Sequence, residues 1–415
     1  MNRRVVVTGL GVVSPIGLNV EDFWKNLVAG KSGVANITYF DTENFDTKFA
    51  AELKGFDPIN YMDRKLSQRV DPFAQYAIVA SDEAMKDSGL NLDKIDLDRV
   101  GVVYGSGIGG MWTYHTQQTN LYKRDGNPDR ISPFFIPMLI ADIAAGRISM
   151  RYGLKGPNYA TISACTTSAH SLADSVMLIE RGDADVMVTG GSEAVICPMG
   201  VGGFNSMKAL STRNDSPEKA SRPFDKNRDG FVMGEGGATL ILEELEFARS
   251  RGARIYGELT GFGLTADAFH ITEPSPEGEG LGRAIKVAVA NSGMTNNDID
   301  VINAHGTSTY YNDKNESLAI KNVFGEKAYD IPVHSIKSMI GHLLGAAGAI
   351  EAIASILTIR DGVIPPTINY EVKDPECDLN YVVNTAIKKE VTTVMSVNSG
   401  FGGHNTALVF KKYEE

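Results

Sequence analysis

The stretch Ala160-Thr-Ile-Ser-Ala-Cys165-Thr-Thr-Ser-Ala-His-Ser-Leu-Ala-Asp-Ser175 begins as a β-type run and turns directly into a helix. Ser163 is a residue type that favours the N-cap, which places Cys165 in the first turn. Unpaired backbone N–H groups and the positive end of the helix dipole favour a thiolate there, the form that attacks carbonyls. These residues alone leave two interpretations open, an activated nucleophile or the small buried hydrophobe that most free cysteines are. The helix is predicted from apolar residues that recur on one face, namely Ala169, Leu172, Ala173, Val176 and Ile179.

The chain has 415 residues, of which 43% are hydrophobic and 22% are charged, the composition of an ordinary globular protein. This length predicts two domains or one doubled fold. The net charge of −11 argues against nucleic acid as the main partner. The three cysteines are odd in number and widely spaced, which gives neither a disulfide framework nor metal-ligand spacing. We therefore predict a reducing, cytoplasmic location and no metal site.

The start of the chain and its longest apolar run predict neither a signal peptide nor a membrane span. Met1-Asn-Arg-Arg leads directly into a predicted strand, Val5–Thr8, so we expect no signal peptide. The run Leu343–Ile359 is slightly short for a membrane span, is broken by Glu351 and is rich in Gly and Ala. It predicts a buried helix that packs closely on its neighbours.

The order of predicted elements in the second part of the chain repeats the order in the first. Apolar runs that end in glycine are typical of central strands in an α/β fold. We predict two duplicated halves, residues 1–254 and 255–415, with an insertion at about 111–150. Pairing the halves would bring Cys165, His305 and His342 together, with Phe401 nearby. The predicted equivalents are Arg4–Gly9 with Ile255–Gly263, Val100–Gly105 with Val301–Gly306, the Cys165 turn with the Lys337–His342 turn, and Val186–Gly191 with Val394–Gly400.

Two stretches imitate ligand-binding motifs. Gly105-Ser-Gly-Ile-Gly-Gly110 matches the dinucleotide pattern G-x-G-x-x-G. An NAD-binding protein is therefore an alternative, and a nucleotide titration would exclude it. The aromatic and polar residues 111–116 do not start a helix cleanly and no acidic strand end follows, so a glycine turn is favoured. Asp225–Gly230 imitates a calcium loop, but Gly236 stands where the last ligand should be Glu, and we exclude calcium.

Several motifs together resemble the β-ketoacyl-[acyl-carrier-protein] synthases, condensing enzymes of the thiolase superfamily. The likeness covers the whole chain in order and is greatest to the type II elongating branch. The motifs are Ser163-Ala-Cys165-Thr-Thr-Ser168, Ala220-Ser-Arg-Pro-Phe-Asp-Lys-Asn-Arg-Asp-Gly230, Asn303-Ala-His305-Gly-Thr-Ser-Thr309, Lys337-Ser-Met-Ile-Gly-His342-Leu-Leu-Gly-Ala-Ala-Gly348 and Gly400-Phe401-Gly-Gly403.

The resemblance implies a thiolase-like five-layer αβαβα fold, a homodimer and an acyltransferase without a cofactor. Cys165 would take the acyl chain from a carrier protein, and malonyl-carrier protein would then lose carbon dioxide and attack the thioester. His305 and His342 would hold the malonyl thioester oxygen, with Lys337 as electrostatic support. Further implied roles are an acid paired with Lys337 at Glu316, an oxyanion hole from the N–H groups of Cys165 and Phe401, a gate at Phe401, and substrate contacts at Ile108, Thr307 and Thr309.

Carrier proteins of this kind are acidic, so a local basic patch would orient docking on a protein of negative net charge. The positions that resemble the family's docking patch are Arg64, Lys65, Arg69, Arg130 and Lys208.

The sequence departs from the family pattern in one loop. The usual Asn-Ser-Phe-Gly-Phe-Gly-Gly is Val397-Asn-Ser399-Gly-Phe401-Gly-Gly here, so Ser399 stands at the first Phe. Val397 stands where a side-chain amide is usual near a monovalent cation, and we do not predict that ion. The altered loop keeps a ketosynthase of a polyketide or aryl-polyene pathway as an alternative. A non-catalytic subunit that sets chain length is a second alternative, against which the presence of Cys165 argues.

Overall fold

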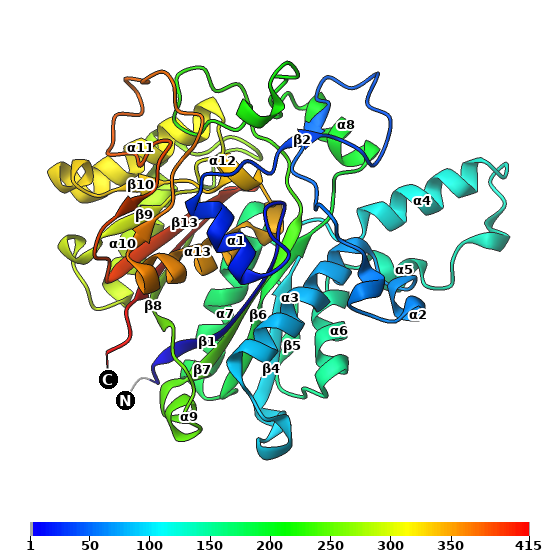
Figure 1. The fold of residues 1–415 in the computed structure, drawn as a ribbon, viewed down its shortest axis with the longest axis horizontal. Coiled ribbons are helices and arrows are strands. Elements are labelled where there is room, and N and C mark those ends of the chain that lie inside the picture. The colour runs from blue at the N-terminus through cyan, green and yellow to red at the C-terminus, as the bar shows by residue number, and fades with distance from the viewer. Residues whose placement is uncertain (1–2, 415) are drawn as a thin grey trace.

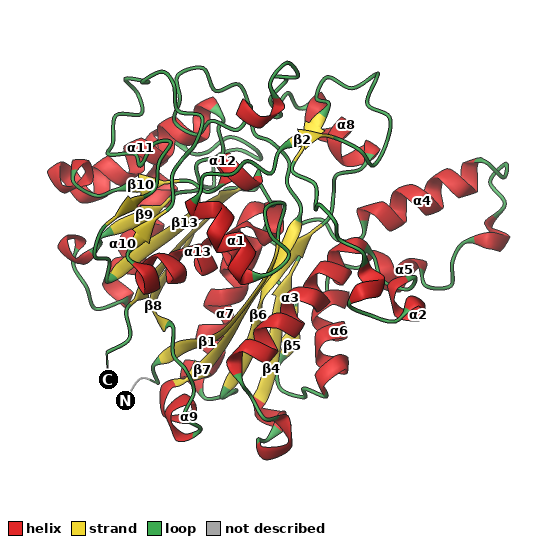
Figure 2. Cartoon of the chain, in the orientation of Figure 1, coloured by secondary structure: helices red, strands yellow, loops and turns green. Residues whose placement is uncertain are grey.

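A ten-stranded sheet runs through the molecule and connects its two halves (Figures 1 and 2). The computed structural model describes residues 3–414. From the centre outward, the first half contributes β1 (Val5–Val13), β7 (Gly236–Glu244), β6 (Val186–Glu193), β4 (Val100–Gly105) and β5 (Asn158–Tyr159). In the same order, the second half contributes β8 (Gly257–Ala266), β14 (His404–Lys411), β13 (Thr393–Gly400), β9 (Val301–Asn303) and β10 (Val333–His334).

The two sets of five strands have the same directions as well as the same order. Strand β4 is parallel to β5 and β6, and β7 is antiparallel to β6 and β1. Likewise β9 is parallel to β10 and β13, and β14 is antiparallel to β13 and β8. The halves join where Val6 and Val7 pair with Glu258 and Gly257. This topology confirms the predicted duplication, whereas the boundary between residues 254 and 255 stays a prediction.

Helices complete five layers around the two sheet halves. Helices α7 and α13 pack on each other and on strands of both halves, while α3 and α6 cover the first half and α10 and α11 the second (Figure 1). The layered α/β architecture confirms the predicted fold class. The bounds are α3 (Pro72–Ser88), α6 (Ile143–Tyr152), α7 (Thr167–Arg181), α10 (Glu279–Asn291), α11 (Tyr310–Phe324) and α13 (Ala347–Asp361).

The central pair of helices depends on small residues. Every residue of α13 from Ala347 to Ile359 is buried, as the apolar run predicts. An added Cβ on Gly348 would lie 2.7 Å from the backbone nitrogen of Ala169 in α7, so glycine permits this close approach. In residues 3–414 no helix combines the length and the hydropathy that crossing a bilayer requires.

A helix begins at Met111, so our expectation that residues 111–116 do not start a helix cleanly is wrong. Residues 111–150, the predicted insertion, are largely helical. They form α4 (Met111–Tyr122), α5 (Phe135–Leu139) and most of α6, and α4 projects from the body (Figure 2). Helix α4 has no capping side chain of its own. Instead, the buried carboxylate of Asp71 accepts hydrogen bonds from the backbone N–H and the hydroxyl of Thr113, 42 positions along the chain.

Shorter elements surround this framework. The remaining helices are α1 (Val20–Val28), α2 (Arg64–Ser67), α8 (Pro198–Ser206), α9 (Leu245–Ser250) and α12 (Lys337–Ile340). Two small ribbons pair β2 (Ala35–Asn36) with β3 (Phe49–Ala50), and β11 (Val363–Ile364) with β12 (Ile387–Lys388).

Candidate active site

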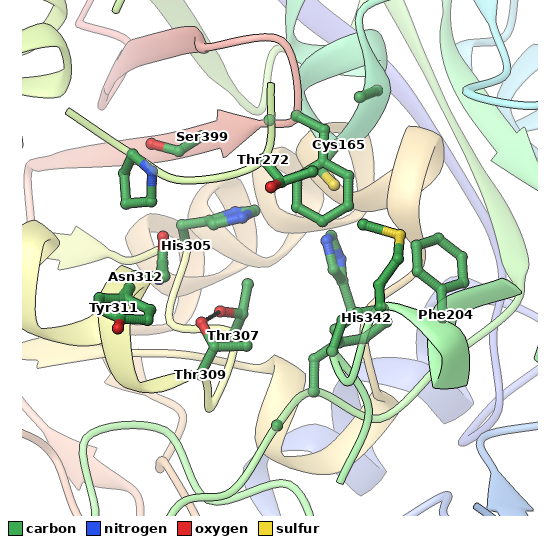
Figure 3. A pocket seen from close by; sticks show the side chains of 18 of the residues that line it. Cys165, Phe204, Thr272, His305, Thr307, Thr309, Tyr311, Asn312, His342 and Ser399 are labelled. Atoms are coloured by element: carbon green, nitrogen blue, oxygen red, sulfur yellow. Dashed lines mark hydrogen bonds between the residues drawn. The ribbon is translucent and has the colours of Figure 1, made fainter. Parts of the chain in front are cut away.

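A cavity of about 520 Å³ is lined by residues that end or follow β4, β6, β9 and β13. Functional groups at the carboxyl ends of parallel strands are typical of open α/β sheets. Both halves contribute, and the side chains of Cys165, His305 and His342 meet here (Figure 3). The sequence-predicted residues that line the cavity are Ile108, Cys165, Lys208, His305, Thr307, Thr309, His342 and Phe401.

Cys165 lies in a 3₁₀ turn, Ala164–Thr166, directly before α7. Burial raises the pKa of the Cys165 thiol to about 12, although the charge of Lys337 and the backbone N–H of Phe401 both lower this pKa. The resting group is therefore a thiol, and the thiolate that we expected from the helix dipole is not favoured.

The turn that carries Cys165 packs against the hairpin of β13 and β14. An added Cβ on Gly400 would lie 3.2 Å from the backbone nitrogen of Cys165, so glycine lets the hairpin approach. The Ser163 side chain makes no capping bond; its hydroxyl lies 2.8 Å from Nδ1 of His170. Our expectation of a Ser163 cap is therefore wrong, because His170 competes for that hydroxyl.

His305 and His342 are buried, and their rings face each other edge to face with centroids 5.2 Å apart. Nδ1 of His342 accepts a hydrogen bond from the backbone N–H of Leu344 at 3.3 Å. Nδ1 of His305 lies 3.3 Å from Nζ of Lys337 and 3.4 Å from Nδ2 of Asn398, which are both donors. Each neutral ring therefore carries its proton on Nε2.

The protonation of the two histidines follows from the same surroundings. Burial lowers the pKa of both rings well below the usual value, and the charge of Lys337 lowers it further. Both rings are neutral and each offers one N–H. Such a pair can donate to an oxygen on which negative charge develops.

Lys337 does not pair with Glu316, and that expectation is wrong. Its ammonium forms a buried ion pair with Glu351 of α13, whose other oxygen accepts from Nδ2 of Asn398 at 2.6 Å. The Glu316 carboxylate instead accepts from the backbone N–H groups of His305 and Gly306, at 2.6 and 2.8 Å. Burial raises the pKa of Glu316 to about 8, while these bonds oppose the shift. Glu316 thus holds the loop that carries His305.

Glu351 and Asn398 are the residues that the motif analysis missed. Glu351 is the one charge within the apolar run Leu343–Ile359, and an isolated acid in a buried helix is itself a signal. Asn398 shares both partners of Lys337, because its amide contacts Glu351 and His305. Glu351 and Asn398 together hold the Lys337 ammonium next to His305.

The altered loop has polar anchors instead of an aromatic side chain. The hydroxyl of Ser399 donates to Oδ1 of Asn405 at 2.7 Å, and Nδ2 of Asn405 donates to Oδ1 of Asp267 at 2.6 Å. These bonds join the turn that carries Phe401 to the segment after β8.

Two family models match most of the chain. The family model "Beta-ketoacyl synthase, N-terminal domain" matches residues 2–248, and "Beta-ketoacyl synthase, C-terminal domain" matches residues 256–371. The chain belongs to the beta-ketoacyl synthase family. This membership confirms the resemblance inferred from the motifs, and with it the acyltransferase class.

Curated relatives and solved structures match this ketoacyl synthase over nearly its full length. It is 51% identical over 413 residues to "3-oxoacyl-[acyl-carrier-protein] synthase 2" of Staphylococcus aureus (strain COL), covering 100% of this chain and 99% of the relative. It is 50% identical over 411 residues to the protein of that name in Coxiella burnetii, covering 99% of each. A beta-ketoacyl synthase from Burkholderia phymatum superposes with a TM-score of 0.91 at 35% identity, over 99% of this chain and 100% of the other. "The ishigamide ketosynthase/chain length factor" gives a TM-score of 0.93 at 36% identity, over 100% of both chains.

The glycine-rich stretch of this ketoacyl synthase is a turn, as we expected. The backbone N–H groups of Gly107 and Ile108 donate to the carboxylate of Glu193, at 2.9 and 3.2 Å. A carboxylate occupies the place that a phosphate would need, which argues against a dinucleotide at this turn.

The five docking candidates of the synthase lie at the surface. Arg64 and Lys65 begin α2, and the Arg69 guanidinium lies over the Phe134 ring at 4.4 Å from its centroid. Arg130 and Lys208 are exposed, and Lys208 also lines the cavity. Among the ion pairs of residues 3–414, none includes these five cations: Arg64, Lys65, Arg69, Arg130 and Lys208.

Proposed function

We propose that the protein elongates fatty acyl chains as a 3-oxoacyl-[acyl-carrier-protein] synthase. One observation carries the proposal: two neutral imidazoles, each with its proton on Nε2, share a cavity with the Cys165 thiol. The names of the curated relatives support the same activity.

In the first step Cys165 takes the acyl group. Its sulfur attacks the thioester carbonyl of acyl-carrier protein, the bond to the carrier sulfur breaks, and the proton of Cys165 passes to that leaving sulfur. The backbone N–H groups of Cys165 and Phe401 would stabilise the oxyanion, and the effect of the Phe401 N–H on the Cys165 pKa supports this role.

In the second step malonyl-carrier protein loses carbon dioxide. The Nε2–H groups of His305 and His342 hold its thioester oxygen as the C–C bond breaks and the electron pair becomes an enolate. Lys337, fixed by Glu351, keeps both rings neutral and favours the negative charge. The enolate carbon then attacks the acyl-Cys165 carbonyl, the C–S bond breaks, and the Cys165 thiolate takes a proton from water as 3-oxoacyl-carrier protein leaves.

The proposal includes two protein partners. An acidic acyl carrier protein would dock on the basic patch, and one structural neighbour is a type II polyketide acyl-carrier protein in complex with its ketosynthase. A second copy of this chain would cover α4 and the segment after it, where large apolar side chains are exposed: Tyr114, Tyr122, Ile136 and Ile140. We place this homodimer in the cytoplasm because all three cysteines are free thiols.

The second candidate function is polyketide synthesis, which the altered loop at Ser399 favours. The reaction product distinguishes it from fatty acyl elongation. With one acyl-carrier protein, excess malonyl-carrier protein and no reducing enzymes, we expect a single 3-oxoacyl product by mass spectrometry. A fatty acid synthase needs its keto group reduced before the next round, so poly-β-ketone chains would favour the polyketide pathway. Absence of any condensation product would contradict both candidates.

Charge reversal in the basic patch tests carrier docking. Arg69→Glu, Arg130→Glu and Lys208→Glu are expected to raise the Michaelis constant for acyl-carrier protein severalfold. A small acyl thioester should be affected less, because it carries no acidic surface. The effect should shrink with salt, since exposed charges are screened over about 10 Å at 0.1 M ionic strength.

A matched control for these variants is Lys94→Glu. Lys94 is exposed and comes before β4, so it lies towards the amino end of that strand, whereas the cavity lies at the carboxyl ends of the strands. Equal effects on both substrates, or an equal effect of Lys94→Glu, would show that the three residues do not form a docking patch.

A further inference from the structure

Glu193, the last residue of β6, is a fully buried carboxylate that forms no ion pair within residues 3–414. Buried acids are usually paired, and an uncompensated one is costly. Four hydrogen bonds replace the missing cation. Oε1 accepts from the hydroxyl of Ser106 at 2.9 Å and from Ile108 N–H at 3.2 Å, while Oε2 accepts from the N–H groups of Gly107 and Gly345 at 2.9 and 3.0 Å.

The donors come from both halves of the duplicated fold. Ser106, Gly107 and Ile108 follow β4, whereas Gly345 lies in the 3₁₀ turn Leu344–Ala346 that precedes α13. An added Cβ on Gly107 or on Gly345 would lie 2.7 Å from Oε2 of Glu193. Glycine is therefore required at both positions, and the carboxylate joins the two loops at the point where the halves meet.

The turn at Gly345 is the counterpart of the turn that carries Cys165. Ala164 and Leu344, each the first residue of a 3₁₀ turn that leads into a helix, share an unusual positive φ, of 52° and 49°. Gly345 thus occupies the position equivalent to Cys165. In the second half Glu193 accepts the N–H of Gly345, whereas the proposed mechanism uses the equivalent N–H of Cys165 for the oxyanion.

This turn also determines which ring nitrogen of His342 carries the proton. The N–H of Leu344, next to the Glu193-bound Gly345, is the donor to Nδ1 of His342. Displacement of the turn would free Nδ1 to take the proton, and Nε2 would then lose its donor. On the other side of the cavity, an added Cβ on Gly107 would lie 3.3 Å from the carbonyl oxygen of Ala164, so Glu193 also adjoins the Cys165 turn.

We propose that Glu193 is a positioning residue for the decarboxylation step: its carboxylate holds the loop Ser106–Ile108 against the turn Leu344–Ala346 and thereby fixes His342 with Nε2–H facing the cavity. The assignment of roles rests on the proposed function. The carboxylate has a second effect, because its negative charge disfavours the Cys165 thiolate. Besides Glu193, the charged groups that act on the thiol are Lys337 of α12, which favours the thiolate, and Glu351 of α13, which disfavours it.

Glu193→Gln tests both effects, because it keeps the shape and removes the charge. The amide nitrogen can donate to the Ser106 hydroxyl but not to a backbone N–H, so at least one hydrogen bond, that from Ile108 N–H, is lost. We expect malonyl-carrier protein decarboxylation to fall about tenfold in kcat, on the scale of one lost hydrogen bond near a charged group. The Michaelis constant should change little. The pH midpoint for alkylation of Cys165 by iodoacetamide should move to lower pH, since a negative charge beside the thiolate is gone.

Two further variants separate positioning from general damage. Glu235→Gln is the matched control, because Glu235 is also fully buried, accepts from Tyr39, Tyr76 and Leu53, and does not line the cavity. It should leave the alkylation profile unchanged. Glu193→Asp keeps the charge but moves it back by one methylene group. It should lower decarboxylation with little change in the alkylation midpoint. This variant tests the positioning role if Glu193→Gln does not fold.

The alkylation profile needs no carrier protein, so its outcome is independent of the proposed function. Wild-type decarboxylation in either Glu193 variant would overturn the positioning role, and an unchanged midpoint in folded Glu193→Gln would overturn the charge effect on the thiol. A wild-type protein that makes no 3-oxoacyl product would instead contradict the proposed function and leave the alkylation result intact.

Discussion

Cys165→Ala is expected to abolish condensation while malonyl-carrier protein still loses carbon dioxide. The substitution removes the one thiol among the described residues that line the cavity, so 3-oxoacyl product should fall to the assay background. His305 and His342 keep their Nε2–H groups, because Nδ1 of each is held by residues that the substitution does not touch. Product mass spectrometry and release of labelled carbon dioxide from malonyl-carrier protein measure the two steps separately.

Peptide mapping of the acylated wild-type protein completes this prediction. Cys197 and Cys377 are also free thiols, but both are fully buried and neither lines the cavity. Cys197→Ala and Cys377→Ala are therefore the controls and should keep the acyl group on Cys165. An acyl group found on either of them, or condensation by Cys165→Ala, would contradict the proposed mechanism.

The fold was predictable because its signals are local and occur twice. Apolar runs that end in glycine mark the strands, and the second pass repeats them, so the equivalence of β4 with β9 could be inferred from spacing alone. Helix α4 could not be predicted, because its first turn is capped by Asp71 from another part of the chain. A capping residue 42 positions away leaves no local signal.

The site was predictable in its residue types but not in its pairing or its charges. Lys337 has two acids within reach along the sequence, Glu316 and Glu351, and only the packing of α13 decides between them. The start of a helix argues for a thiolate at Cys165, but the burial that outweighs this effect is a property of the assembled halves. Glu193 has no motif of its own, because its four donors come from loops on both halves.

His305→Ala and His342→Ala are each expected to lower malonyl decarboxylation about a hundredfold or more, the usual cost of losing one oxyanion donor. Acylation of Cys165 should be affected much less, because the N–H groups of Cys165 and Phe401 remain. His342→Asn should retain more activity than His342→Ala, since its amide still offers an N–H. Decarboxylation should also be flat with pH above about 6, because burial and Lys337 lower the pKa of both histidines well below their usual value and the neutral donors persist.

His115→Ala provides the control for these variants. His115 lies in α4, contacts Trp112 and does not line the cavity, so its loss should leave both steps at the wild-type rate. Single-turnover acylation and release of labelled carbon dioxide should be followed in each variant. If His305→Ala or His342→Ala decarboxylates malonyl-carrier protein as fast as wild type, that ring does not hold the thioester oxygen. Activity that rises as the pH falls towards 5 would mean that a charged imidazolium is the donor, and the argument from burial beside Lys337 would fail.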